Sequence, residues 1–238
     1  MKWALFDQRR MVRHGVWTEG DEQQCAEWVA QCAAVIVCAS GQVDYQAWGL
    51  DDPKVCRLTA QSPLPIAIDY DTPHTLGPDR IAAACGAWRL ACAGQQRRGT
   101  VVIDAGTCIT IDYLDAAGVY HGGAILPGIE MKFHALHTFT AKLPLLENID
   151  AEKRCVTGKT TSDAIIAGVL TATRFEVEGF VRHYRQQHGA VSVVLTGGDA
   201  ERLLCGMQLS DCRCEPALVH IGLEEVLAFR QKEMKCQE

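Results

Sequence analysis

Three apolar segments follow one another in the middle of the chain, at residues 100–103, 108–114 and 119–126. The connections between them, residues 104–107 and 115–118, are long enough for hairpin turns but too short for a helical crossover. We therefore expect three strands in hairpin succession. Long helical segments follow, then an apolar strand at residues 192–196 and a final helix from residue 222. This order predicts the α/β class, with mixed sheets flanked by helices.

The first part of the chain has a similar pattern. We expect a hairpin from residues 2–6 and 11–17, and a helix over 22–33. Two short strands are expected at 33–39 and 64–68, followed by a helix that begins at Pro78. The polar segment 94–99 then interrupts the pattern, and 238 residues suffice for two domains of roughly 100–150 residues each. We place the boundary there, which divides the chain into residues 1–97 and 98–238.

Composition limits the classes of partner. The formal net charge is −6, so no bulk attraction to nucleic acid or to an anionic membrane is indicated. The 12 cysteines include no Cys-x-x-Cys pair, and the tightest group (Cys205, Cys212, Cys214 and His220) matches no common zinc spacing. The first residues resemble no signal peptide, and no segment has the 18 apolar residues of a membrane span. We expect a cytoplasmic protein with no nucleic acid or membrane partner.

The turn Asp104-Ala105-Gly106-Thr107 is the most informative segment for chemistry. An apolar strand leads directly into a carboxylate and a turn of small residues, and the next strand starts at once. Backbone N–H groups in such a turn can bind a phosphate while the aspartate holds a cation. The alternative is a tight hairpin in which Asp104 only caps the turn.

A second turn of this kind is Thr196-Gly197-Gly198-Asp199. It also follows an apolar strand, and it opens a helix. With no side chains at the two glycines, an adenosine or a phosphate could lie against the backbone. The alternative is an ordinary connection from strand to helix.

A third candidate is the loop 69–80, shaped by proline and glycine, with Asp79 and Arg80 at the start of a helix. An aspartate at that position often stabilises the helix N-terminus. The functional alternative is a carboxylate that accepts a proton from a substrate hydroxyl, with an arginine that orients an anionic group.

Taken together and in order, the motifs resemble those of the type III pantothenate kinase family over nearly the whole chain. They are Tyr70, Gly77-Pro78-Asp79-Arg80, Asp104-Ala105-Gly106-Thr107, Gly122-Gly123-Ala124-Ile125-Leu126-Pro127-Gly128, Ala135-Leu136, Thr140-Ala141-Lys142-Leu143-Pro144, Gly158-Lys159-Thr160-Thr161 and Thr196-Gly197-Gly198-Asp199. The resemblance implies the actin/sugar-kinase (ASKHA) fold, with two ribonuclease-H-like halves and ATP in the cleft. Residues 1–97 would carry the pantothenate loop, and residues 98–238 the second phosphate motif and the adenosine region.

The resemblance also implies an activity, the ATP-dependent phosphorylation of pantothenate to 4'-phosphopantothenate, the first step of coenzyme A biosynthesis. It implies ATP with Mg²⁺, a monovalent cation (K⁺ or NH₄⁺) and a homodimer. Asp79 would be the general base and Asp104 the cation ligand. The other implied site residues are Tyr70, Gly77, Pro78, Arg80 and Thr161 for pantothenate, Gly106 and Thr107 for the ATP phosphates, and Gly197 and Gly198 near the adenosine.

One family motif is missing. Type III pantothenate kinases begin with a strand and a phosphate loop of the form Asp-x-Gly-Asn-Thr/Ser-x-x-Lys, whereas this chain begins Met1-Lys2-Trp3, as though cut just before that lysine. Either the start is misplaced, or the chain is a catalytically impaired or regulatory (accessory-factor-like) member of the family. A different kinase or hydrolase of the same fold is disfavoured by the loop 70–80. We expect ATP binding weakened by roughly 10²-fold or more, since each lost contact to a charged group costs roughly 1.5–3 kcal/mol. We also expect disorder or distortion in residues 1–7.

Overall fold

The computed structural model describes residues 1–94, 97–147, 149 and 155–236. The chain forms two compact units, one of Met1–Ala93 with Ala217–Glu238 and the other of Gly94–Pro216. The chain passes from the first unit to the second at Gly94, the start of the polar segment where the domain boundary was expected. The last helix belongs to the first unit, so the two units are not two consecutive halves of the chain.

The N-terminal hairpin of the first unit consists of β1 (Lys2–Asp7) and β2 (Arg10–Val16), which pair antiparallel. At its open end the backbone N–H of Trp17 donates to the carbonyl of Met1 at 2.7 Å. The expected hairpin is confirmed. Residues 2–7 form a strand and not the disordered segment that was one expectation, but the pairing register shifts between Leu5 and Phe6, which is a local distortion. The aromatic side chains explain the order: the ring of Trp3 lies 5.3 Å from that of Trp17 and 4.7 Å from that of Trp28. Burial of such large rings stabilises the strand that carries them.

Two further strands of the first unit, β3 (Val35–Val37) and β4 (Val55–Arg57), pair in parallel. Helix α1 (Glu22–Gln31) supplies buried Cys25 and Val29 to a core that also contains Trp17 and Leu50. The short elements β5 (Ala67–Ile68) and η1 (Pro73–Thr75) then lead to the next helix.

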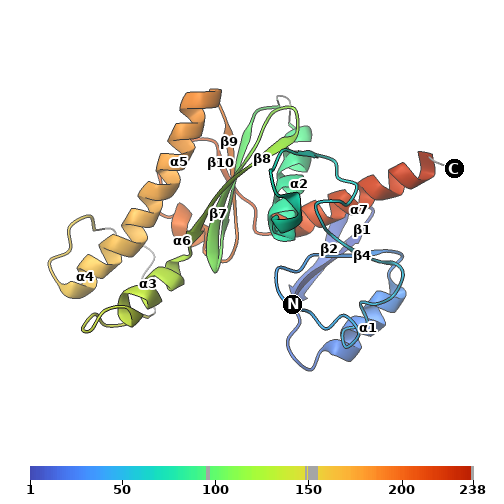
Figure 1. The fold of residues 1–238 in the computed structure, drawn as a ribbon, viewed down its shortest axis with the longest axis horizontal. Coiled ribbons are helices and arrows are strands. Elements are labelled where there is room, and N and C mark those ends of the chain that lie inside the picture. Colours follow the sequence, from blue (N-terminus) through green and yellow to red (C-terminus); the bar gives the residue numbers. More distant parts are fainter. Residues whose placement is uncertain (95–96, 148, 150–154, 237–238) are drawn as a thin grey trace. The chain divides into compact units, whose positions relative to one another are not determined.

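Helices α2 (Pro78–Cys92) and α7 (Leu218–Cys236) pack against each other in the first unit (Figure 1). Two glycines allow their backbones to approach closely. A Cβ atom on Gly222 would overlap the carbonyl oxygen of Ala82, and one on Gly86 would overlap the carbonyl oxygen of Leu218. This packing explains why the last helix, far along the chain, belongs to the first unit.

The second unit contains a mixed sheet in which five strands lie in the order β10-β9-β6-β7-β8. Strands β6 (Thr100–Ala105), β7 (Cys108–Leu114) and β8 (Val119–Pro127) are successive antiparallel neighbours. Strand β9 (Ser192–Thr196) pairs in parallel with β6, and β10 (Cys212–Cys214) in parallel with β9. The predicted hairpin succession and the α/β class are confirmed.

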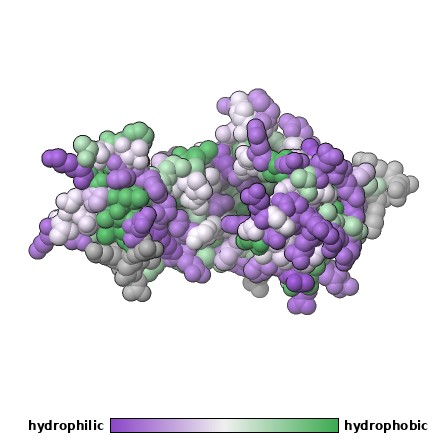
Figure 2. Space-filling model, turned by 90° about the horizontal axis from the view of Figure 1, so that it is seen from below, coloured by the Kyte–Doolittle hydropathy of each residue, from purple (hydrophilic) through white to green (hydrophobic). Residues whose placement is uncertain are grey.

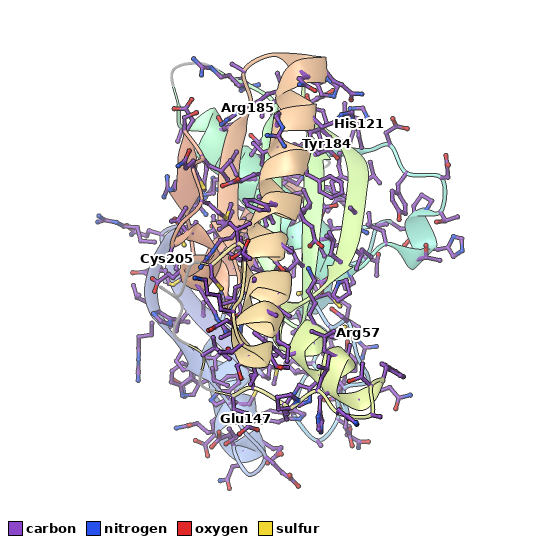
Figure 3. All side chains as sticks on the ribbon, turned by 90° about the vertical axis from the view of Figure 1, so that its left-hand side faces the viewer. Arg57, His121, Glu147, Tyr184, Arg185 and Cys205 are labelled. Carbon is purple, nitrogen blue, oxygen red and sulfur yellow. The ribbon has the colours of Figure 1, made fainter. Side chains whose placement is uncertain are left out.

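The helices of the second unit are α3 (Ile129–Thr138), α4 (Thr161–Ile166), α5 (Ala172–His188) and α6 (Ala200–Leu204), with a π-helical segment, η2 (Ala167–Thr171), joining α4 to α5. Helix α5 lies along one face of the sheet (Figures 1 and 3), and its Val177 and Val181 share a core with Val101 and Ile103 of β6. Tyr184 of α5 stacks on Tyr113 of β7 at a centroid distance of 5.0 Å. Among the helices of the described residues, none is long and apolar enough to cross a bilayer.

Candidate active site

Asp79 lies in the first turn of α2, one residue after Pro78. Its Oδ1 accepts a hydrogen bond from the backbone N–H of Arg80 at 2.9 Å, and its Oδ2 accepts one from the hydroxyl of Ser40 at 2.7 Å. The residue at the N-cap position is Gly77, not Asp79. The half-buried carboxylate is therefore held at both oxygens, and it is not the N-cap of the helix.

The residues around Asp79 form one cluster within the first unit. Arg80 is buried, with 7% of its surface exposed, and its guanidinium carbon lies 6.0 Å from the centre of the Tyr70 ring. A cation at that distance from an aromatic face is attracted to it. A Cβ atom on Gly77 would come within 2.5 Å of Asp79 Oδ1, so only glycine fits there without moving the carboxylate. The structure thus brings together Tyr70, Gly77, Pro78, Asp79 and Arg80.

Two neighbours of Asp79 were not found from the sequence. Ser40 and Cys38 lie just after β3, on a segment that contains no recognised motif. Burial, together with the negative charge of Asp79, raises the pKa of Cys38 to about 11, so its thiol is neutral at pH 7. The position of Cys38 and Ser40 directly after an apolar strand could have indicated them, because Asp104 was identified from its position at the end of an apolar strand.

The second unit brings the two predicted turns together. Strand β6 pairs with β9 so that Asp104 lies beside Thr196, and Gly197 has a φ of +95°. A Cβ atom on Gly197 would lie 2.5 Å from Asp104 Oδ1 and would overlap the carbonyl oxygen of Ala105. The backbone N–H of Asp199 donates to that same carbonyl at 2.9 Å. Because of this close approach, position 197 requires glycine.

The turn after Asp104 is packed against a further glycine. Gly106 N–H donates to the carbonyl of Cys108 at 3.0 Å, and Gly128 N–H donates to the carbonyl of Thr107 at 3.1 Å. A Cβ atom on Gly128 would overlap the carbonyl oxygens of both Gly106 and Thr107. Thr107 is exposed, and a Cβ atom on Gly198 would have no atom within 4 Å. Thr107 and the backbone at Gly198 are therefore open to a ligand beside the carboxylates of Asp104 and Asp199, an arrangement that suits a phosphate or a nucleoside.

Charged side chains border the second of these turns. Arg202 lies 2.6 Å from a carboxylate oxygen of Glu130 and 3.8 Å from one of Asp199. Burial raises the pKa of Asp199, with a further contribution from Glu130, and the Arg202 charge opposes the rise. The carboxylate of Asp199, which directly follows Gly197 and Gly198, therefore has its charge partly neutralised by Arg202.

Thr161, the last of the predicted site residues, is the first residue of α4 and is exposed. The hydroxyl of the preceding Thr160 caps this helix by accepting the N–H of Asp163 at 3.1 Å. Thr161 belongs to the second unit and the Asp79 cluster to the first, so its contact with the substrate stays a prediction.

The described parts of the chain contain no cluster of side chains typical of a metal site. No three His, Cys, Asp or Glu side chains there are grouped closely enough to bind an ion. The Asp104 carboxylate and the carbonyl oxygen of Ala105 both lie close to Gly197, and hard cations bind oxygen atoms of these two kinds.

The comparisons with known proteins agree with the motifs. The family described as type III pantothenate kinase matches residues 1–183. A type III pantothenate kinase of Cytophaga hutchinsonii is 47% identical over 146 residues, which are 60% of this chain and 58% of that protein. One of Flavobacterium johnsoniae is 35% identical over 209 residues, 85% of this chain and 83% of that one. The match to the Cytophaga protein therefore spans less than two thirds of its length.

A solved structure supports the fold. The crystal structure of a conserved putative Baf family transcriptional activator from Campylobacter jejuni superposes with a TM-score of 0.58, at 19% identity, over 87% of this chain and 88% of that one. At this identity the likeness describes the architecture alone. The family match over residues 1–183 and the identity of 35% across most of the chain establish the relationship by sequence. The chain belongs to the type III pantothenate kinase family.

Proposed function

We propose that this chain transfers the γ-phosphoryl group of ATP to the primary hydroxyl of pantothenate, giving 4'-phosphopantothenate and ADP in the first step of coenzyme A biosynthesis. The observation that carries the proposal is the Asp79 carboxylate, held at both oxygens beside Arg80 and Tyr70 in a chain of this family.

In the proposed reaction Asp79 accepts the proton of the pantothenate hydroxyl as the hydroxyl oxygen attacks the γ-phosphorus. The bond from the γ-phosphorus to the bridging oxygen breaks, and ADP leaves with that oxygen. The proton ends on Asp79. A positioned general base of this kind contributes about 10²–10⁴ in rate, and most of the remaining acceleration of phosphoryl transfer comes from positioning and charge neutralisation.

We assign pantothenate binding to the residues around the base and to one residue of the second unit. The buried guanidinium of Arg80 provides a fixed positive charge that can orient an anionic group of the substrate. Tyr70 provides an aromatic surface next to it. Gly77 and Pro78 fix the start of α2, which positions Asp79. Thr161 completes the proposed substrate set.

We assign the nucleotide to the turns of the second unit, with Mg²⁺ bound to the ATP phosphates as part of the substrate. Gly106 and Thr107 would contact phosphate oxygens, and Gly197 and Gly198 would lie near the adenosine. We also propose that Asp104 holds K⁺ or NH₄⁺, which would supply positive charge near the phosphates. The exposed hydroxyl of Thr107 and the absence of side chains at the glycines support this assignment.

A homodimer is also proposed. Large apolar side chains are exposed on the second unit, among them Phe139 (85%), Val156 (73%) and Phe175 (55%). Figure 2 shows hydrophobic surface on the part of the second unit at the left of the view. Apolar groups gathered on a surface are typical of protein contacts. A cytoplasmic location, where ATP is available, is proposed with it.

The test of the proposal is product formation. The purified chain is incubated with pantothenate and Mg-ATP in potassium buffer, and the products are identified by ³¹P NMR and mass spectrometry. We expect 4'-phosphopantothenate and ADP in equal amounts, and ADP formation that depends on pantothenate. If ATP and pantothenate both bind at millimolar concentration and no phosphorylated product forms, the proposal is contradicted. The proteins that match by sequence are named type III pantothenate kinases, which favours the enzyme over the regulatory alternative.

A further inference from the structure

Asp79 receives a hydrogen bond from a residue far away in the sequence. The hydroxyl of Ser40 donates to Asp79 Oδ2 at 2.7 Å across a sequence separation of 39 residues. Ser40 follows β3, whose position is fixed by its parallel pairing with β4, and Asp79 is fixed by the start of α2. The hydrogen bond therefore links two independently anchored segments of the first unit.

The two hydrogen bonds to Asp79 restrict different motions. The contact from the N–H of Arg80 to Oδ1 is local, because it joins adjacent residues. The contact from Ser40 to Oδ2 comes from another element and fixes the rotation of the carboxylate about its last side-chain bond. Each carboxylate oxygen has two lone pairs, so each can still accept a hydrogen bond from a substrate hydroxyl.

The surroundings of the pair favour a role for Ser40 in orientation. Cys38, two residues before Ser40, is a neutral thiol at pH 7 because burial, reinforced by the Asp79 charge, raises its pKa to about 11. It therefore adds no charge to compete with Asp79. Ser40 itself is exposed, so burial of its side chain contributes little to the core.

We propose that Ser40 is a positioning residue that orients the Asp79 carboxylate for proton transfer from the substrate. This inference rests on the proposed function, because it takes Asp79 to be the general base. Ser40 acts through Asp79 and makes no contact with the reacting atoms. Its removal should therefore lower kcat and leave the binding of ATP unchanged.

The first experiment measures kcat and KM for ATP and pantothenate in Ser40→Ala, Ser40→Thr and Thr18→Ala. Ser40→Ala should lower kcat by about tenfold, the effect of one lost hydrogen bond to a charged group, with KM for ATP unchanged. Ser40→Thr retains the hydroxyl and should restore most of kcat. Thr18→Ala is the matched control, because the Thr18 hydroxyl also donates to an aspartate of the first unit, Asp21, at 3.2 Å, outside the site. Its kcat should equal that of the unmodified chain.

The second experiment is a double-mutant cycle with Asp79→Asn. If Ser40 acts through Asp79, Ser40→Ala should cause no further loss in the Asp79→Asn background. The inference is overturned if Ser40→Ala keeps full kcat, if Ser40→Thr is as slow as Ser40→Ala, or if the loss is equally large without the Asp79 carboxylate. Failure of the proposed function gives a different result, namely no phosphorylation of pantothenate by the unmodified chain, and failure of the base assignment gives an Asp79→Asn variant with near-normal kcat.

Discussion

Gly197→Ala tests the close approach of the two turns in the second unit. The backbone at Gly197 has a φ of +95°, and its Cβ would overlap the carbonyl oxygen of Ala105 and lie 2.5 Å from Asp104 Oδ1. A residue other than glycine pays about 1–2 kcal/mol for a left-handed conformation, and overpacking adds about 1–3 kcal/mol. The Ala105 oxygen belongs to the backbone and cannot swing aside. We expect a loss of about 3 kcal/mol in the free energy of unfolding.

That loss corresponds to a fall in Tm of about 6–12 °C for a chain of this size. The matched control is Gly198→Ala, where a Cβ would have no atom within 4 Å. We expect its Tm to be unchanged or slightly higher, since alanine restricts the unfolded chain. Both variants are compared with the unmodified chain by differential scanning calorimetry and urea unfolding. Equal stability of the two variants would refute the described geometry of the turns.

Three further predictions concern other parts of the chain. If Asp104 holds a monovalent cation, exchange of K⁺ for Na⁺ or tetramethylammonium should lower kcat sharply. Asp104→Asn should abolish that salt dependence, and equal rates of the unmodified chain in all three salts would contradict the assignment. Gly222→Ala should destabilise the first unit by about 2 kcal/mol or more, because the added Cβ would overlap the carbonyl oxygen of Ala82 in α2. An unchanged midpoint of urea unfolding would refute the close packing of the two helices. Burial alone would raise the pKa of Asp115, but hydrogen bonds from two backbone N–H groups and from His121 lower it below its ordinary value. The contribution of Asp115 to stability is therefore present above the ordinary pKa of an aspartate and is lost as the pH falls through the lowered pKa. Asp115→Asn should thus destabilise the protein more at pH 7 than at pH 2.5, as measured by urea unfolding at each pH.

Strands with a strong local pattern could be predicted from the sequence. The strands at residues 108–114 and 192–196 have the predicted bounds, and α2 begins at Pro78 as expected. In each case the signal was an apolar run between turn residues, or a proline at the first helical position. The short strand β4 was missed because three residues carry no periodicity.

Features that depend on distant contacts could not be predicted. The last helix joins the first unit because Gly86 and Gly222 let two helices approach, and neither glycine indicates its partner in the sequence. The hydrogen bond between Ser40 and Asp79 likewise depends on where β3 ends in space. The strand formed by residues 2–7 likewise depends on a contact between residues far apart in the sequence, the stacking of Trp3 on Trp17.

The most direct test of the central claim is the rate of pantothenate phosphorylation by Asp79→Asn. Asparagine keeps the size of the side chain and can still accept a hydrogen bond from Ser40, but it cannot take the substrate proton. We expect kcat to fall by about 10²–10⁴, with the Tm and the Kd for ATP close to those of the unmodified chain. A variant that folds, binds ATP and retains near-full kcat would contradict the assignment of Asp79 as the general base.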